Sequence, residues 1–528
     1  MSMLSAPPLI RVFIAALLLS GLAACAVNPV TGQRELALIS TAEEIQLGEQ
    51  YYAPSLQMQG GEYRLDPALT AYIEEVGRRL AEVSDRELPY QFAVINSSVP
   101  NAWALPGGKI AINRGLLLEM QSEAELAAVL GHEIVHAAAR HGARAQQRAM
   151  LLQGVILAGA IASGDSGFGH LAVGGLSVAA QLVSQRYSRG AELEADRYGM
   201  LYMSRAGYDT QGAVELQETF VRLSGDRRQD WLSGLFASHP PTQERVRANR
   251  VTAAELPSGG ESGRTAYLEA TATLREQQPA YALIDAGRKA LVERDYDTAR
   301  ARADEAIALL PQEAHGYALR GDVARMQQRP GDALADYRQA VERDPGFFYF
   351  PLQSGLARLA LEQWQAAGED LRQSVALLPT VPAYYGLGVV AEREGDLPGA
   401  KDYYRRAASP NSEAGRAAQR ALLRLDLADN PGDYLRLRHG TDAQGRLVAE
   451  VHNPQPLAVT GLVVELRYRD AAGRLREERR ALRSAVAAGA TVQETIASAA
   501  EVSGARELEV RLVAARLVDE AEPAPAAR

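Results

Sequence analysis

Residues 122–142 read SEAELAAVLGHEIVHAAARHG, and this stretch predicts a long helix that carries a metal-binding motif. Ser122 is followed three residues later by Glu125, the capping-box pattern of a helix start, and strong helix formers fill the next turns. His132 and His136 are four residues apart, so on a helix both imidazoles lie on one face, one turn apart. We therefore expect one helix from Ser122 to about Gly142.

The segment His132-Glu133-Ile134-Val135-His136 has the H-E-x-x-H pattern of zinc hydrolases. Two imidazoles on one helix face can bind one zinc ion, and Glu133 beside them can accept a proton from a water molecule at the metal. The sequence has eight histidines, so the pattern would arise by chance on the order of once in a hundred such chains. The motif predicts His132 and His136 as metal ligands and Glu133 as the general base.

A catalytic zinc ion takes three protein ligands, so the third has to come from another part of the chain. No histidine follows at the spacing of metzincins. Residues 191–196, AELEAD, instead place Glu192 and Asp196 four apart on a second predicted helix, Arg186–Arg205. One of these acids can bind the metal while the other accepts a hydrogen bond from a ligand histidine.

Two neighbouring polar residues are predicted to lie away from the metal. Glu194 falls on another side of its helix from Glu192. His141 follows His136 by five residues, which places it about 140° around an ideal helix. We therefore expect His141 at the protein surface.

Four ordered blocks of this sequence resemble the gluzincin peptidases of the HtpX and BepA kind. They are Asn101–Gly108 (NAWALPGG), His132–His136, Glu192–Asp196, and Ser238–Thr242 (SHPPT) followed by Arg245. The blocks span roughly residues 95 to 250. The repeats further along the chain extend the likeness to the BepA type, which joins a protease to tetratricopeptide repeats. A C-terminal β domain is not part of that pattern.

The resemblance implies one Zn²⁺ per chain, with Glu192 as the third ligand and Asp196 as the paired acid. It also implies that His239 can occupy the open zinc position and hold the enzyme latent; hydrogen bonding to the oxyanion of the reaction is the alternative role. Two strands are predicted, Tyr90–Asn96 and Lys109–Asn113, and we expect an extended substrate to pair with the main chain of the second. This predicted substrate-binding set comprises Asn101, Lys109, Ile110, Ala111, Ile112 and Asn113.

Residues 1–24 are predicted to be a lipoprotein signal peptide. Arg11 precedes the apolar run Val12–Leu19, and Leu22–Cys25 (LAAC) resembles the bacterial lipobox. Cys25 is the only cysteine in the sequence, which rules out an internal disulfide and favours a lipid anchor. We expect a periplasmic protein anchored through Cys25, and the Ala that follows it resembles the signal for delivery to the outer membrane.

Residues 280–430 are predicted to form tetratricopeptide repeats, an α-solenoid of stacked helix pairs. Three kinds of residue recur at a spacing of 34: Pro311, Pro345 and Pro379; Gly287, Gly321 and Gly355; Ala299, Ala333 and Ala367. Small residues recur where the two helices of a pair approach closely, and a fourth unit fits one residue out of register at Gly388 and Ala400. Such a stack offers a concave surface to a substrate or partner.

The chain as a whole is predicted to be mainly α and multidomain. A gluzincin α+β metalloprotease domain is expected over 25–255, and a linker over 256–279 leads to the repeats. Alternating and Val/Leu-rich segments over 431–519 favour a small C-terminal antiparallel β domain, similar to a sandwich. The Ala/Pro/Glu-rich residues 520–528 are predicted to be a disordered tail.

The formal net charge of −9 argues against nucleic acid as a partner, because phosphate binding needs a basic surface. Together these features predict a zinc endopeptidase that degrades or assists misfolded or stalled envelope and outer-membrane proteins. By resemblance, its repeats would contact the outer-membrane protein assembly machinery. The rival hypothesis is a non-enzymatic or dual-function periplasmic chaperone or adaptor, against which the intact set of metal-site residues argues.

Overall fold

The computed structural model of the chain describes residues 25–147, 182, 186–225, 238–501, 503 and 505–518. The predicted signal peptide (1–24) and disordered tail (520–528) lie outside the described residues. Contacts divide the chain into two units, residues 1–350 and 351–528. None of the described helices combines the length and apolar character needed to span a bilayer.

A three-stranded sheet with the strand order β3–β5–β4 forms the centre of the first unit. β3 (Gln91–Ile95) runs parallel to the central β5 (Lys109–Asn113), whereas β4 (Ala102–Leu105) is antiparallel to β5. All five residues of β5 are buried, as expected for a strand covered on both faces. β5 has the predicted bounds and β3 lies within the predicted strand, but β4 was not predicted as a strand.

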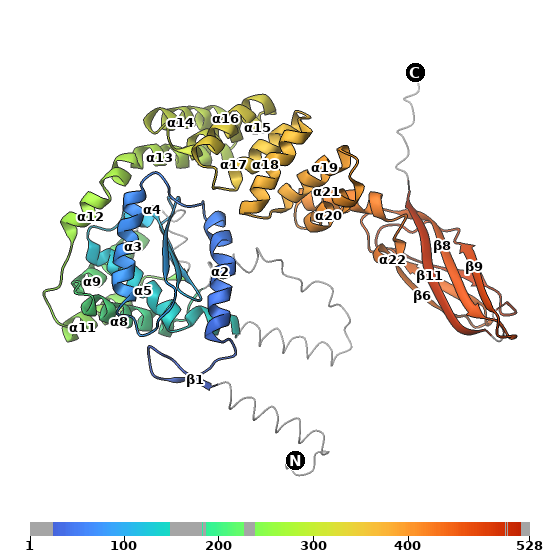
Figure 1. The fold of residues 1–528 in the computed structure, drawn as a ribbon, viewed down its shortest axis with the longest axis horizontal. Helices are drawn as coiled ribbons and strands as arrows, with labels where there is room; N and C mark the ends of the chain where they lie inside the picture. The colour runs from blue at the N-terminus through green and yellow to red at the C-terminus, as the bar shows by residue number, and fades with distance from the viewer. Residues whose placement is uncertain are drawn as a thin grey trace, which may run out of the picture. The chain divides into compact units, whose positions relative to one another are not determined.

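Helices cover both faces of this sheet, and Figure 1 shows the strands between α3 and α2. The alternation of side chains along β3 and β5 explains the two layers: Val94 and Ile112 pack with α3 and α5, whereas Ile95 and Ala111 pack with α2. The helices that build this α/β domain are α2 (Thr41–Met58), α3 (Pro67–Ala81), α4 (Arg114–Leu117), α5 (Glu123–Ala138), α8 (Arg189–Arg205), α9 (Gln211–Gly225), α11 (Gln243–Glu255) and α12 (Arg264–Ala270).

Two glycines allow α5 and α8 to cross closely. Gly131 of α5 lies against Gly199 of α8, and a Cβ atom added to Gly199 would lie 3.0 Å from the backbone nitrogen of His132. Both helices begin at a serine N-cap, Ser122 for α5 and Ser188 for α8, whose side chain accepts a hydrogen bond from a backbone N–H in the first turn. This crossing brings the motif on α5 next to the acidic residues on α8.

Helix pairs follow the protease domain in the chain, as the 34-residue period predicted. They are α13 (Ala272–Val292), α14 (Tyr296–Leu309), α15 (Ala314–Met326), α16 (Pro330–Arg343), α17 (Tyr349–Ala360), α18 (Trp364–Leu377), α19 (Val381–Arg393), α20 (Leu397–Ala407) and α21 (Glu413–Asp426). The recurring glycines lie where a side chain of the second helix crosses the first: a Cβ at Gly321 would lie 2.8 Å from Tyr337. Ala333 and Ala367 are fully buried in the same way.

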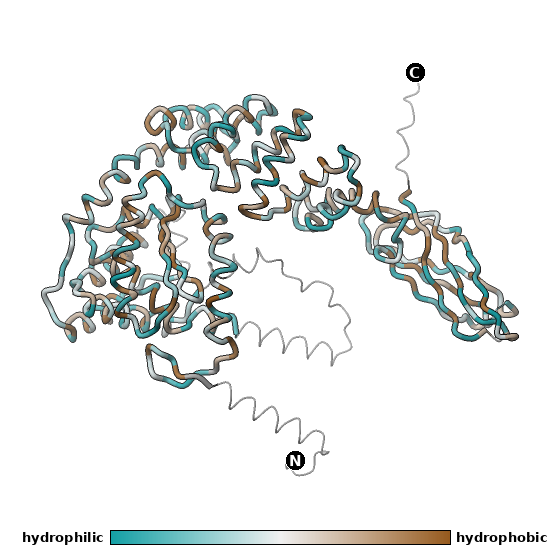
Figure 2. Tube along the Cα trace, in the orientation of Figure 1, coloured by the Kyte–Doolittle hydropathy of each residue, from teal (hydrophilic) through white to brown (hydrophobic). Residues whose placement is uncertain are grey.

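The second unit ends in two three-stranded antiparallel sheets, with the strand orders β10–β7–β6 and β11–β8–β9. Their strands are β6 (Arg436–Thr441), β7 (Leu447–His452), β8 (Val459–Arg469), β9 (Leu475–Ala481), β10 (Thr491–Ala497) and β11 (Arg506–Leu517), preceded by α22 (Pro431–Tyr434). Val451, Val464 and Leu512 belong to one core that the two sheets share, and Figure 2 shows hydrophobic and hydrophilic residues alternating along these strands. The predicted fold class, with its protease domain, solenoid and small β domain, is thereby confirmed.

Candidate metal centre

Four buried side chains converge where α5, α8 and residue 239 meet. We call His132, His136, Glu192 and His239 the metal-site cluster, because one ligand atom from each lies within 4.8 Å of the others. His132 Nε2 is 2.9 Å from His136 Nε2. The Glu192 carboxylate lies 3.6 Å from His132 Nε2 and 3.5 Å from His136 Nε2. The carboxylate is therefore within reach of a cation held by both imidazoles.

The protonation states of His136 and Glu192 fit a divalent metal ion, whereas burial lowers the pKa of His239 less than Glu133 and Glu192 raise it. Burial lowers the pKa of His136 well below its ordinary value, so the ring is neutral and keeps a lone pair for a metal. Burial alone would raise the pKa of Glu192, but His239 and His136 lower it further than burial raises it, so the side chain is a carboxylate. Two imidazoles and one carboxylate form a ligand set typical of catalytic zinc. The residues present therefore fit this metal.

Asp196 and Arg245 fix the orientation of His132. His132 Nδ1 donates a hydrogen bond to Asp196 Oδ1 at 2.9 Å, which leaves Nε2 with its lone pair toward the cluster. Arg245, on α11, donates to both oxygens of Asp196 at 2.7 Å, and its Nη1 lies 2.9 Å from Glu192. The pKa of Asp196 is lowered because the effect of Arg245 outweighs that of burial. The sequence placed Arg245 in a family block but gave no role for it.

His141 is buried, so its predicted surface position was wrong. α5 ends at Ala138, and Arg140 has a φ of 62°, which breaks the helix and turns the chain before a new helical segment at 141–147. His141 is therefore not 140° away from His136. Its Nδ1 lies 2.8 Å from His136 Nδ1, and its Nε2 lies 3.1 Å from Glu194 Oε1. Burial lowers the pKa of His141 more than Glu194 raises it.

Glu133 and His239 face each other across the cluster. His239 Nδ1 is 3.1 Å from Glu192 Oε1 and 3.3 Å from His132 Nε2, and its Nε2 is 3.7 Å from Glu133 Oε1. The other oxygen of Glu133, Oε2, is buried without a hydrogen-bond partner among the described residues. Burial raises the pKa of Glu133. An unpartnered buried carboxylate oxygen at this position points to a proton-transfer role.

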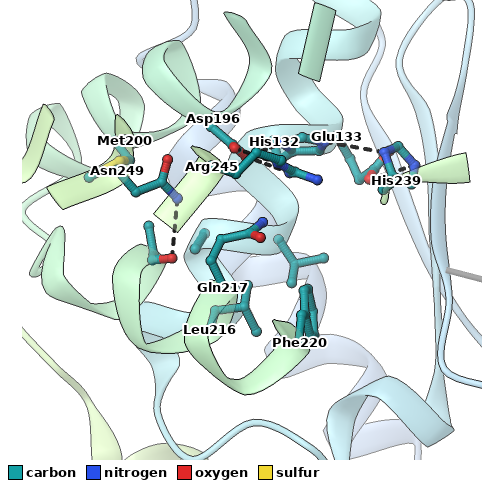
Figure 3. A pocket seen from close by; sticks show the side chains of 13 residues that line it. His132, Glu133, Asp196, Met200, Leu216, Gln217, Phe220, His239, Arg245 and Asn249 are labelled. Carbon is teal, nitrogen blue, oxygen red and sulfur yellow. Dashed lines mark hydrogen bonds and ion pairs between the residues drawn. The ribbon is translucent and has the colours of Figure 1, made fainter. Parts of the chain in front are cut away.

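A small pocket with a volume of about 40 Å³ lies beside Glu133 and His132. Figure 3 shows Leu216, Gln217 and Phe220 of α9 on the side of the pocket opposite His132 and Glu133. Its apolar walls are completed by Ala128, Val129, Met200 and Ala213. Gln217 Oε1 is buried without a hydrogen-bond partner among the described residues, so the pocket offers a second free acceptor besides Glu133 Oε2.

The predicted pairing of substrate along Lys109–Asn113 was wrong. These residues form β5, which is hydrogen-bonded to β3 on one side and to β4 on the other, so it has no open edge. Ile110, Ala111 and Ile112 are core residues. Lys109, Asn113 and Asn101 are also buried, and their polar groups hold nearby loops: Asn113 N donates to Asn101 O at 2.8 Å, its side chain to Val99 O, and Lys109 to Pro89 O.

Cys25, the predicted lipidation site, is the first residue of β1 (Cys25–Val27). β1 pairs with β2 (Arg34–Leu36) in an antiparallel ribbon in which Cys25 is opposite Leu36. Asn28, just after β1, donates a hydrogen bond to the carbonyl of Ala139 at 3.2 Å. The chain that follows Cys25 is therefore attached to the turn at the end of α5.

The fold and the metal-site cluster define the gluzincin arrangement of a metallopeptidase, with two histidines on one helix and a glutamate on a second helix. Residues 67–253 match Peptidase family M48. The metalloprotease YcaL of Escherichia coli strain K12 is 31% identical over 177 residues, which are 32% of this chain and 67% of that protein. The chain belongs to peptidase family M48.

Two longer relatives also match the chain. The beta-barrel assembly-enhancing protease of Escherichia coli strain K12 is 30% identical over 254 residues, or 47% of this chain and 51% of that protein. The protease of the same name from Yersinia pestis is 34% identical over 222 residues, or 40% and 43%. The chain thus spans about half the length of these relatives, or less. A crystal structure of MamA protein is 21% identical over 28% of this chain and 84% of that chain, with a TM-score of 0.25.

Proposed function

We propose that this chain is a zinc-dependent endopeptidase of the bacterial periplasm. The observation that carries the proposal is the convergence of His132, His136 and Glu192 beside Glu133 in one buried cluster. One Zn²⁺ per chain would be held by the first three residues. Membership of peptidase family M48 supports the same reaction, hydrolysis of a peptide bond.

Glu133 is proposed to carry the proton of this reaction. When bound, zinc would make a water molecule more acidic and polarise the carbonyl group of the peptide. Glu133 accepts the proton of the attacking water and returns it to the leaving amine. Its burial raises the pKa of the carboxyl group, which makes Glu133 a stronger base than an exposed glutamate. Asp196, held by Arg245, keeps His132 in the tautomer that presents Nε2.

His239 is proposed to hold the enzyme latent by taking the fourth position at the metal. Its ring lies against Glu192 and His132, where water and the peptide carbonyl have to enter. His239→Ala should raise self-cleavage and casein cleavage several-fold at unchanged zinc content. Unchanged proteolysis would count against gating, and a large loss of cleavage would favour the oxyanion role.

An unfolded substrate is proposed to add as a strand to β4. β4 is an edge strand, and no described strand pairs with its outer side. It also packs against α5, which carries Glu133. Main-chain pairing at a sheet edge does not depend on sequence, so it suits unfolded or stalled segments.

The pocket beside Glu133 is proposed to select one substrate side chain. Its apolar walls favour a substrate side chain that is mostly apolar, and the free acceptor on Gln217 favours a hydrogen-bond donor at the end of that side chain. Gln217→Leu should therefore shift cleavage of a peptide library toward purely aliphatic residues. Glu215→Gln, an exposed change on the same helix, is the control and should leave the profile unchanged.

The cellular setting is proposed from the sequence and from the relatives. Cleavage before Cys25 and lipidation of that residue would anchor the chain to the outer membrane. The relatives named beta-barrel assembly-enhancing protease support a role in β-barrel assembly, and we propose misfolded or stalled outer-membrane proteins as the substrates. The repeats (280–430) are the proposed contact surface for substrates and for the assembly machinery. Residues 256–279, the predicted linker, join them to the protease domain (25–255) and contain α12 and the first turns of α13. The β domain (431–519) has no assigned partner.

Glu133→Gln tests the proposed activity most directly. In full-length protein loaded with zinc, it should lower casein cleavage by about 10²- to 10⁴-fold, because general acid–base catalysis is lost. One zinc per chain should remain, and a chelator should abolish wild-type cleavage. Glu215→Gln is again the control. Cleavage at the wild-type rate by zinc-loaded Glu133→Gln protein would overturn the assignment. A wild-type chain that suppresses aggregation but cleaves nothing would favour the chaperone alternative.

A further inference from the structure

The ring of His136 is hydrogen-bonded on the side away from the metal-site cluster to a second histidine. His136 Nδ1 is 2.8 Å from His141 Nδ1, and the other nitrogen of His141 is 3.1 Å from Glu194 Oε1. His141 is 3% exposed, so water does not compete freely for these contacts. Three side chains therefore form one hydrogen-bonded chain that ends at a ligand histidine.

The direction of each hydrogen bond in this chain follows from its last member. The Glu194 carboxylate can only accept, so the proton lies on Nε2 of His141. A neutral His141 then has a lone pair on Nδ1, and two facing ring nitrogens make a hydrogen bond only if one of them carries a proton. His136 Nδ1 must therefore be the donor. This arrangement leaves the lone pair of His136 on Nε2, the atom that faces His132 and Glu192.

We propose that His141 and Glu194 are positioning residues that fix the tautomer and orientation of His136 and thereby set the affinity of the chain for zinc. The inference rests on the proposed metal site. Neither residue touches the metal position; both act through His136. Hydrogen-bond partners of ligand histidines typically change metal affinity by about 10- to 100-fold when they are removed.

The two ligand histidines are held in different ways, which makes the role of His141 specific. His132 donates directly to Asp196, and that carboxylate is held by Arg245. His136 instead donates to a neutral ring, and the carboxylate is one residue further away. α8 supplies both acids, Asp196 on the side of His132 and Glu194 on the side of His141.

The backbone is built to bring His141 to this place. Arg140, in the left-handed conformation, is held by the buried Glu44 and by the carbonyl of Ile39. The turn at Arg140 directs the next residue back toward His136. Glu194 is in turn 3.7 Å from Arg144, which pairs with Glu35 at 2.9 Å. The Glu194 carboxylate, which accepts the last hydrogen bond of the series, is thus also held on the side away from His141.

Three variants of the full-length protein separate positioning from packing. His141→Leu removes the acceptor for His136 but keeps an apolar side chain in the space. His141→Asn keeps an acceptor, since Oδ1 of the asparagine can lie where Nδ1 of the histidine lies. Glu194→Ala removes the carboxylate that accepts the last hydrogen bond of the series. Zinc affinity is measured by competition with a chromogenic chelator, and thermal unfolding of the metal-free protein reports on folding. His439→Leu, an exposed histidine on β6, is the control.

We expect His141→Leu to bind zinc about 10- to 100-fold more weakly, His141→Asn to stay within about 3-fold of wild type, and Glu194→Ala to lose about 3- to 10-fold. Wild-type affinity in His141→Leu, or equal losses in His141→Leu and His141→Asn, would overturn the proposal. If His141→Leu does not fold, unchanged affinity in Glu194→Ala overturns it instead. Failure of the wild-type chain to bind one zinc would refute the metal site itself and not its positioning residues.

Discussion

The first unit contains two buried polar clusters that are built from similar residues but are completed in different ways. The second lies between the protease domain and the first repeats, and we call Asn96, Arg114, Tyr281, Glu313 and His315 the junction cluster. Within it, Glu313 accepts hydrogen bonds from Tyr281 at 2.7 Å, from Asn96 at 3.2 Å, and from His315 N at 3.0 Å. Its buried polar atoms thus find their partners inside the protein.

The metal-site cluster is the opposite case. Two imidazole nitrogens converge at 2.9 Å, and Glu133 keeps a buried oxygen without a partner among the described residues. Leaving a buried polar group unpaired costs about 1–3 kcal/mol, so such an arrangement persists where a ligand or a reaction uses it. The two clusters are alike in burial and differ in that the metal-site cluster lies beside a buried carboxylate oxygen that has no partner among the described residues.

The largest expected effect is that of Glu192→Ala at the metal-site cluster. Removal of a ligand should lower zinc affinity by more than about 100-fold, since loss of an outer hydrogen bond alone costs up to that much. Zinc content after dialysis should fall from one per chain to nearly none, and casein cleavage should fall with it. Elemental analysis and a cleavage assay measure both. Retention of one tightly bound zinc would exclude Glu192 as a ligand.

Glu313→Ala should have the next largest effect, and on stability alone. The change leaves Tyr281, Asn96 and His315 without their common acceptor, at a cost of about 3 kcal/mol in the free energy of unfolding. Chemical denaturation of the full chain measures it. Zinc affinity of the folded protein should stay at the wild-type value. A drop in zinc affinity as large as that in Glu192→Ala would show that the two clusters are not separate.

Helix periodicity, which is local information, was sufficient to pair His132 with His136 and Glu192 with Asp196, whereas the choice of Glu192 as the ligand and the role of His239 came from the family resemblance. Four-residue spacing put His132 with His136 and Glu192 with Asp196, and the structure brings both pairs to one place. The 34-residue period likewise predicted the helix pairs of the repeats, because each glycine of that period lies against a side chain of its own helix pair.

The errors came from backbone breaks and from pairing between distant segments. A single left-handed residue, Arg140, reversed the expected position of His141. The central place of β5 depends on β4, whose short AWAL sequence did not stand out as a strand. The junction cluster was not predicted at all, because Asn96, Arg114 and Glu313 are far apart in the sequence and form no motif.

Acid should weaken the junction cluster through Glu313. Burial raises the pKa of this carboxyl group, but His315 and the other donors outweigh burial and lower it from 4.5 to about 2. A lowered folded-state pKa contributes stability that is present above the unfolded value, near 4.5, and is lost as the pH falls toward 2. We expect about 3 kcal/mol to be lost over this range.

Glu313→Gln provides the measurement for this pH dependence, because it cannot titrate. The stability difference between wild type and Glu313→Gln should be constant above about pH 5 and should shrink steadily below pH 4.5. Denaturation curves of metal-free protein at several pH values give this difference and avoid the loss of zinc in acid. A difference that does not change with pH would contradict the assignment of the lowered pKa to Glu313.

The smallest expected effects come from two conservative substitutions, one in the junction cluster and one beside the metal-site cluster. Arg114 donates to Asn96 at 2.7 Å and lies over the ring of Tyr281, whereas Arg245 donates to both oxygens of Asp196. Lysine keeps the charge but loses the planar guanidinium group with its paired donors, which costs about 1–2 kcal/mol at either position.

Arg114→Lys should lower only the free energy of unfolding. Arg245→Lys should also lower zinc affinity, by about 10-fold, because Asp196 would hold His132 less firmly. Equal zinc affinity in the two variants would mean that Arg245 stabilises the fold in the same way as Arg114 and does not position a ligand.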